Sequence, residues 1–302
     1  MSRIIKALLL ALTVCCASAE DAQWKTTLAA KLADARVNES SGLAISRRCP
    51  GIFWTLNDSG GGPFLFAIDE KGCTRARCEI KGAANFDWED IASGPDEEGT
   101  PTLFIGDIGD NLLIRSELEV YQVAEPVLDS AASGEPAETQ ATLVRKLRAA
   151  YPDGRHNAES LLCHPRTGRL FVITKSETGQ CGVYAFPVKL QTSACMNLEA
   201  VAQFRIPPLR RPGKRSIDNC MATGACFSPD ATRLVVSTYS SIYEWRLDPA
   251  KPLADPLAQT PLRIVPPAMI QCEAVCFGPD GKSLWLTSEH VPTPLYRIEV
   301  EK

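Results

Sequence analysis

Five segments of the sequence share one layout, and this internal repeat limits the possible folds more than any other feature. Each segment begins with a short run of small residues, turns into an apolar run rich in β-branched and aromatic residues, and ends with a run of alternating polarity. A weaker fourth strand pattern fills the gap to the next segment, as at 142–147 and 200–206. Repeats of four strands are typical of β-propeller blades. The segments begin at equivalent positions, namely Ser41, Glu89, Glu159, Thr223 and Glu273.

In three segments the turn after the first strand combines proline with aspartate or glycine, at 164–168, 228–230 and 278–281. Such turns join antiparallel strands. We therefore predict an all-β fold, a single β-propeller of five four-stranded blades. A sixth, degenerate blade in one of the long connectors and a pair of β-sandwiches are the alternatives. The last segment has three strands, so the N-terminal stretch 27–37 is expected to supply its outer strand and close the ring.

The start of the chain has the pattern of a secretory signal peptide. Two basic residues precede the apolar run 7–14, and an Ala-Ser-Ala cleavage sequence follows before Glu20. We expect cleavage before Glu20, a propeller domain over 20–302, and a periplasmic or secreted protein. A lipoprotein anchor at Cys15 or Cys16 is the alternative. No later apolar run is long enough to span a bilayer.

Ten of the twelve cysteines remain after the predicted cleavage, and an even, high count in an exported protein favours disulfides. Buried thiols are the alternative. The absence of a C-x-x-C pair and the presence of only three histidines argue against a zinc site. Positions in the repeat suggest the pairs Cys49–Cys73, Cys163–Cys195, Cys181–Cys220 and Cys226–Cys276.

Charge and motifs exclude several functions. The formal net charge is −4, so no overall basic field is present to hold nucleic acid. The chain has no G-x-S-x-G elbow, P-loop or G-x-G-x-x-G fingerprint. We expect a monomer with no nucleic-acid partner and no transmembrane segment.

Four motifs of the chain are distinctive, namely Glu39-Ser-Ser-Gly-Leu-Ala, Asn57-Asp-Ser-Gly-Gly, Phe86-Asp-Trp-Glu-Asp-Ile-Ala and Gly106-Asp-Ile-Gly-Asp-Asn. They resemble those of an uncharacterised family of secreted bacterial β-propellers, of the WD40/TolB-like and SdiA-regulated-like kind. The resemblance implies a propeller and export, and it transfers no activity. A looser similarity links the blades to calcium-dependent propeller lactonases and phytases, which place acidic residues around the central channel.

The equivalent first residues of the segments are the main candidates for a site. The first strand of each propeller blade lines the channel, so these five side chains should form a ring at its mouth. Three carboxylates crowded together raise one another's pKa unless a cation compensates. Carboxylate and hydroxyl oxygens favour Ca²⁺. We predict a Ca²⁺ site with ligands Glu89, Glu159 and Glu273, and a metal-free carboxylate network is the alternative.

Polar loops after the second strands should open on the same face, where binding residues usually lie. A basic connector at 210–215 suits a small anionic ligand such as a phosphate ester or a sugar acid. Ordinary turns and a solvated loop are the alternatives. The predicted ligand-binding residues are Asn57, Asp58, Asp107, Asp110, Lys175, Arg210 and Arg211. The candidate catalytic residues are Asp58, Asp107 and His290.

These observations favour an exported propeller that binds a small anionic ligand or a protein partner at one face, with a cation at the channel mouth. The alternative is a Ca²⁺-dependent hydrolase of a phosphate ester or a lactone, in which a carboxylate or an imidazole acts as general base. A purely structural interaction module is the third hypothesis.

Overall fold

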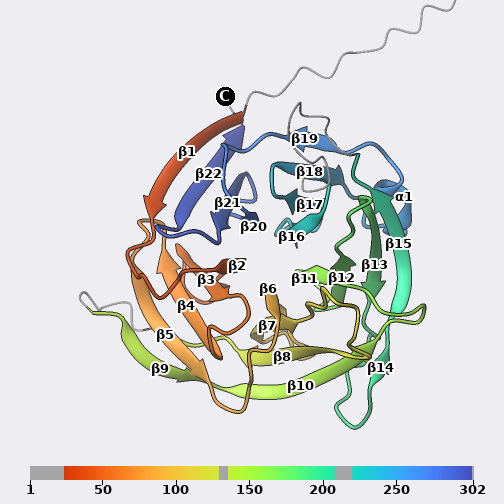
Figure 1. Ribbon diagram of the computed structural model, residues 1–302, viewed down its shortest axis with the longest axis horizontal. Coiled ribbons are helices and arrows are strands. Elements are labelled where there is room, and N and C mark those ends of the chain that lie inside the picture. Colours follow the sequence, from red (N-terminus) through yellow and green to blue (C-terminus); the bar gives the residue numbers. More distant parts are fainter. Residues whose placement is uncertain (1–23, 129–134, 208–219, 301–302) are drawn as a thin grey trace, which may run out of the picture.

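The computed structural model describes residues 24–128, 135–207 and 220–300, which form five β-sheets around a central channel (Figure 1). Within these ranges the only helix is the short α1 (Ala254–Leu257). The structure confirms the predicted all-β fold and the five-bladed propeller. No helix in the described ranges has the length and apolar character needed to cross a membrane.

The blades follow one another in chain order, and each runs from the channel to the rim. Blade one contains β2 (Ser40–Ile45), β3 (Ile52–Asn57), β4 (Phe64–Asp69) and β5 (Thr74–Ile80). Blade two contains β6 (Trp88–Pro95), β7 (Pro101–Asp107), β8 (Leu118–Ala124) and β10 (Leu143–Ala150). Blade three contains β11 (Ala158–Cys163), β12 (Leu170–Thr174), β13 (Gln180–Ala185) and β15 (Glu199–Arg205).

Blades four and five complete the ring. Blade four contains β16 (Ala222–Phe227), β17 (Arg233–Thr238), β18 (Ser241–Arg246) and β19 (Leu262–Ile264). Blade five contains β20 (Cys272–Phe277), β21 (Ser283–Ser288), β22 (Pro294–Val300) and β1 (Trp24–Lys31). The described parts of the long connectors form no sixth blade. They add parallel edge strands, β9 (Ala137–Ala141) beside β5 and β14 (Met196–Asn197) beside β10.

The N-terminal strand closes the ring as predicted. β1 pairs antiparallel with β22, with Trp24 opposite Val300 and Lys31 opposite Pro294, so the two ends of the described chain share one blade (Figure 1). The pairing begins and ends earlier than the predicted 27–37. After Lys31 the chain turns toward the channel, and the amide of Leu32 bonds to the carbonyl of Thr293 at 2.8 Å.

The five inner strands β2, β6, β11, β16 and β20 surround the channel, and each packs against the inner strands of both neighbouring blades. In every inner strand the register with the second strand shifts at the second residue. Such a shift is a β-bulge, and its extra, unpaired residue points its side chain in a different direction from the regular pleat. The residues at the bulges are the five predicted equivalents, Ser41, Glu89, Glu159, Thr223 and Glu273, one position later in each strand than predicted.

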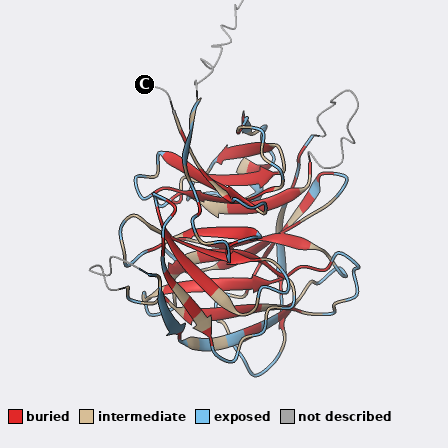
Figure 2. Ribbon diagram, turned by 60° about the vertical axis from the view of Figure 1, so that its left-hand side comes forward, coloured by how far each residue is buried: buried red, intermediate tan, exposed pale blue. Residues whose placement is uncertain are grey.

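The hydrophobic core is divided among the contacts between blades. Each of the five buried apolar clusters joins two adjacent blades, as where Phe104 of β7 meets Leu161 of β11. Apolar second strands fill these layers on both faces, as in β12, in which every residue is buried. Figure 2 shows buried residues throughout the strands and exposed residues mainly in loops and outer strands.

None of the ten cysteines from Cys49 to Cys276 forms a disulfide in the structure, so none of the four suggested pairs is formed. Many of the thiols pack as small apolar side chains instead, because their positions face the layers between blades. Burial raises the pKa of Cys163 and of Cys181 to about 12, which keeps these thiols protonated.

Candidate functional site

We call the end of the channel at which the second strand of each blade ends the channel mouth. A group of three carboxylates lies there, where blades one and two meet. Asp58 follows β3, Asp87 precedes β6, and Glu89 occupies the bulge of β6. One carboxylate oxygen from each lies within 4.8 Å of the other two. Trp88 is buried in the core. Because successive side chains of a strand point to opposite faces, Asp87 and Glu89 point away from the core, toward the channel. We call these three residues the acidic group.

Gly109 keeps the space beside the acidic group open. It lies in the loop from β7 to β8, and its amide donates to the carbonyl of Asp87 at 3.3 Å. A Cβ at this position would clash with Oδ2 of Asp87 and with Oε1 of Glu89. A glycine therefore allows the backbone to approach both carboxylates without filling the space between them.

The acidic group carries unbalanced negative charge. Burial first of all, together with nearby carboxylates such as Glu289 and Asp87, raises the pKa of Asp58 to about 6. Burial also raises the pKa of Asp87, and it raises the pKa of Glu89 well above the usual range, with a further contribution from Glu159. A bound cation would reverse these shifts. Three hard oxygen donors converging on one space fit Ca²⁺ or Mg²⁺.

Glu159 lies at the equivalent bulge of blade three and is paired with a lysine. Nζ of Lys175, directly after β12, donates to Oε1 of Glu159 and, at 2.8 Å, to Oη of Tyr239. Burial still raises the pKa of Glu159 to about 7, although Lys175 acts against the shift. The structure thus brings two predicted site residues together as an ion pair, with Tyr239 as an unpredicted third member.

Glu273, at the bulge of blade five, interacts with a second glutamate. Burial first of all, together with a hydrogen bond with Glu289, raises the pKa of Glu273 to about 10, which favours its protonated form. The side chain of Gln271 donates to Oε2 of Glu289. Glu89, Glu159 and Glu273 therefore occupy equivalent bulges with three different partners, and their joint binding of Ca²⁺ stays a prediction.

Three predicted ligand-binding residues anchor loops. Oδ1 of Asn57 accepts from the amides of Asn38 and Glu39 at 3.2 and 3.3 Å. Oδ1 of Asp107 accepts from Nη1 of Arg115 at 2.7 Å. Asp110 accepts from the amides of Ile114 and Arg115 at 2.8 and 2.9 Å. These bonds hold the loops around the acidic group.

The remaining predicted residues are His290 and two arginines of the basic connector. His290 is exposed in the loop from β21 to β22. Arg210 and Arg211, with the rest of the basic connector, lie outside the described residues. Their role in binding an anion stays a prediction.

Sequence reasoning missed Asp87 and Glu289 as parts of the site. Asp87 stands in the Phe86-Asp-Trp-Glu-Asp motif, and its signal was the spacing of two from Glu89, with a large aromatic residue between them. Glu289 follows the second strand of blade five, at the place that Asp58 holds in blade one. The alignment of polar loops across the repeat includes this glutamate, but only His290 of that loop is among the predicted site residues.

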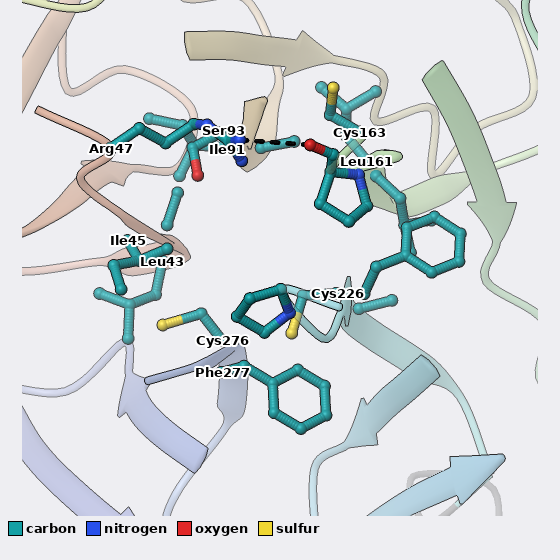
Figure 3. A pocket seen from close by; sticks show the side chains of 17 residues that line it. Leu43, Ile45, Arg47, Ile91, Ser93, Leu161, Cys163, Cys226, Cys276 and Phe277 are labelled. Carbon is teal, nitrogen blue, oxygen red and sulfur yellow. Dashed lines mark hydrogen bonds between the residues drawn. The ribbon is translucent and has the colours of Figure 1, made fainter. Parts of the chain in front are cut away.

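The channel beneath the mouth is lined mostly by apolar side chains. Asp90, next to the bulge of β6, is buried and accepts hydrogen bonds from the amides of Ile91 at 2.8 Å and Leu161 at 2.9 Å. Toward the other end, residues of all five inner strands line a cavity of about 80 Å³. Apolar side chains and the thiols of Cys226 and Cys276 make up most of its lining, together with Arg47 and Ser93 (Figure 3).

Comparisons with known proteins identify no family. No family model and no curated protein matches the chain. Among solved structures, the gluconolactonase XC5397 of Xanthomonas campestris is similar with a TM-score of 0.45 and 12% identity, over 87% of this chain and 72% of that one. A putative gluconolactonase from a structural genomics consortium has a TM-score of 0.44 and 16% identity, over 87% of this chain and 75% of its own. Similarity this low assigns no activity.

Proposed function

We propose that this protein binds a divalent cation, Ca²⁺ first of all, at the acidic group, and that the cation attracts the anionic oxygen of a small ligand at the channel mouth. The observation that carries the proposal is the convergence of Asp58, Asp87 and Glu89 within 4.8 Å beside a space that Gly109 leaves open. When bound, the cation supplies positive charge that can hold a ligand oxygen.

The charges at the mouth support this assignment. The ammonium group of Lys175 is already paired with Glu159, so it leaves the acidic group without a directly bonded positive partner among the described side chains. Burial is the main cause of the raised pKa of these three carboxylates, and repulsion from neighbouring carboxylates adds to it. A bound cation would stabilise their charged forms, whereas a purely structural role would not.

The predicted export also favours Ca²⁺. Extracellular modules bind Ca²⁺ with dissociation constants of roughly 0.1 to 1 mM, which sites with few protein ligands can reach. We propose a periplasmic or secreted location on the basis of the N-terminal pattern. Sequencing the N-terminus of the exported protein, which we expect to begin at Glu20, tests it.

Thermal melts test cation binding. After treatment with EDTA, addition of Ca²⁺ at a hundredfold excess over its dissociation constant should stabilise the fold by about 2.7 kcal/mol, because only the native state binds it. For a chain of this size that corresponds to a rise in Tm of roughly 5–10 °C. In Asp87→Asn the rise should disappear, while the Tm without Ca²⁺ should stay equal or increase because repulsion is relieved.

Glu98→Gln is the matched control, because Glu98 is exposed in the turn at the opposite end of blade two. This variant should keep the full response to Ca²⁺. Wild-type protein that shows no shift with Ca²⁺, Mg²⁺ or Mn²⁺ would remove the proposal and leave a structural carboxylate network. An unchanged response in Asp87→Asn would place the cation elsewhere.

Hydrolysis of a lactone or a phosphate ester is the second candidate function. One observation favours it: Glu159 lies at the mouth with its pKa raised to about 7, near the value that suits a general acid or base at neutral pH. A panel of chromogenic esters and lactones tests this. Loss of activity in Glu159→Gln with the fold intact would support hydrolysis, whereas no turnover across the panel would leave binding as the function.

A further inference from the structure

A cavity at the mouth end of blade three is separate from the acidic group. It has a volume of about 500 Å³, and it lies between strand β13, the loop from β12 to β13 and the connector that leads into β11. No residue of the acidic group lines it. Its volume falls in the range of small-molecule sites, roughly 300–1,000 Å³. The function proposed above assigns this cavity no role.

Strand β13 forms one wall of the cavity. Cys181 and Val183 are buried in the core between blades three and four. Because side chains alternate along a strand, Gln180, Gly182 and Tyr184 lie on the other face, and all three line the cavity. A Cβ at Gly182 would lie 2.6 Å from Cε2 of Tyr184, so the tyrosine ring occupies the space beside this residue. A glycine inside a strand often marks a place where another group approaches closely.

Hydrogen bonds fix the aromatic residues of this wall. Oη of Tyr184 donates to Oδ2 of Asp153 at 2.8 Å, and Nε2 of His156 lies 3.1 Å from the same hydroxyl and 3.0 Å from Oδ1 of Asp153. The ring of Tyr151 packs edge-on against His156 and Tyr184, with centroids 4.9 and 4.8 Å away. Side chains that are ordered before a ligand arrives lose less entropy when it binds.

Four amide side chains line the cavity in two pairs. Nδ2 of Asn157 donates to Oδ1 of Asn111 at 3.0 Å, and Nε2 of Gln180 donates to Oε1 of Gln203 at 3.5 Å. Nδ2 of Asn111, Oε1 of Gln180 and Nε2 of Gln203 bond to no other described residue. The cavity thus offers amide donors and acceptors side by side. A hydroxyl group is also both donor and acceptor, so neighbouring hydroxyls of a ligand match this arrangement.

The lysine, arginine and glutamate side chains that line the cavity carry no excess charge. Lys175 is paired with Glu159. Arg155 and Glu177, both exposed, have opposite signs. Charge complementarity therefore selects neither an anion nor a cation. An apolar ligand is also disfavoured, because it would leave the amides without partners.

We propose that this cavity is a second small-molecule site, which binds a neutral, hydroxyl-rich ligand such as a monosaccharide or a cyclic polyol. The paired amides bond to its hydroxyls, and Arg155 and Glu177 add a planar donor and a planar acceptor. Binding here needs no cation. The inference therefore goes beyond the proposed function and does not depend on it.

Titrations of EDTA-treated protein test the proposal, followed by saturation-transfer NMR and calorimetry. The neutral probes are glucose, galactose, mannose and myo-inositol, and the charged analogues are glucuronate and glucosamine. At least one neutral probe should bind saturably, and the two charged analogues should bind no more tightly than glucose. Each lost hydrogen bond should weaken binding about two- to tenfold. In Gln180→Ala/Gln203→Ala the dissociation constant of the neutral probe should thus rise roughly 5- to 100-fold.

Gln140→Ala is the matched control, because Gln140 is an exposed glutamine in the outer strand β9 of blade one. It should keep the wild-type affinity, and so should Asp87→Asn. No saturable binding of any neutral probe, or equal affinity in the double variant, would overturn the inference. Tighter binding of glucuronate than of glucose, lost in Arg155→Gln, would replace the neutral ligand with an anion. Failure of the proposed function appears separately, as melts that do not respond to Ca²⁺.

Discussion

One residue position, the bulge of each inner strand, serves two purposes around the channel. At two blades it is a hydroxyl that joins neighbouring blades: Oγ of Ser41 donates to the carbonyl of Glu89 at 2.6 Å, and Oγ1 of Thr223 donates to the carbonyl of Cys272 at 2.8 Å. At the other three it is a glutamate that faces the mouth. The same backbone position therefore either stabilises the ring or supplies charge, depending on the side chain.

Asp90 allows a direct test at this scale. Asp90→Ala leaves the amides of Ile91 and Leu161 without their acceptor inside the channel. A buried amide that loses its partner costs about 1–3 kcal/mol, so we expect a loss of about 3 kcal/mol or more in the free energy of unfolding. Asp90→Asn keeps one acceptor oxygen and should cost less. Urea denaturation measures both, and unchanged stability in Asp90→Ala would show that these bonds contribute nothing.

At the scale of elements, aspartates close the turns at the end of the propeller opposite the mouth. In the turn from β16 to β17, Asp230 accepts from Oγ of Ser228 and from the amide of Thr232, at 2.6 and 3.0 Å. Asp280 does the same in blade five, where its side chain accepts from the amides of Lys282 and Ser283 at 2.9 and 3.1 Å. The Pro-Asp signal in the sequence thus identifies turns that are locally satisfied, which is why they were predictable.

The Asp230 turn predicts a pH dependence. Hydrogen bonds, first from Ser228, lower the pKa of Asp230 to about 2 from its ordinary 3.8. Because the folded-state pKa is the lower one, its stabilising effect is complete above pH 3.8 and is lost as the pH falls from there to about 2. Asp230→Asn should flatten the decline in stability across this window. The loss at pH 7 should stay below about 1 kcal/mol because the turn is exposed.

Denaturation of wild-type protein and Asp230→Asn from pH 2 to 5 provides the measurement. Asp248→Asn is a suitable control, since Asp248 lies in an exposed turn of the same blade after β18. Parallel stability curves for wild type and Asp230→Asn would contradict the prediction.

At the scale of the whole molecule, closure by β1 removes the free edge of β22. Deletion of residues up to Lys31 should expose that edge and break the pairing from Trp24 to Lys31. Since β1 is largely exposed, most of the loss comes from hydrogen bonds at about 1 kcal/mol each. We expect the Tm to fall by roughly 10–20 °C and self-association to appear. Light scattering and melts measure this, and a monomer with unchanged Tm would show that closure is dispensable.

Much of the architecture could be predicted because it repeats. The same strand pattern occurs five times, so each occurrence supports the others and the bulge positions align without coordinates. The spacing of the cysteines could not predict whether they form disulfides, because two thiols at equivalent sequence positions need not face each other. The closest carboxylate group also escaped prediction, since Asp87 lies in a connector rather than in the aligned strand.

By itself the sequence determined the all-β class, the five blades, the strand that closes the ring and the ring of equivalent positions. Local strand patterns and their repetition are enough to specify these features, because each blade must bury its two faces against its neighbours. Only the tertiary structure decided which charges meet. It paired Glu159 with Lys175 and Glu273 with Glu289, and it left Asp58, Asp87 and Glu89 together beside Gly109. The reason is that such contacts cross from blade to blade, where loop geometry and bulges, rather than residue order, set the distances.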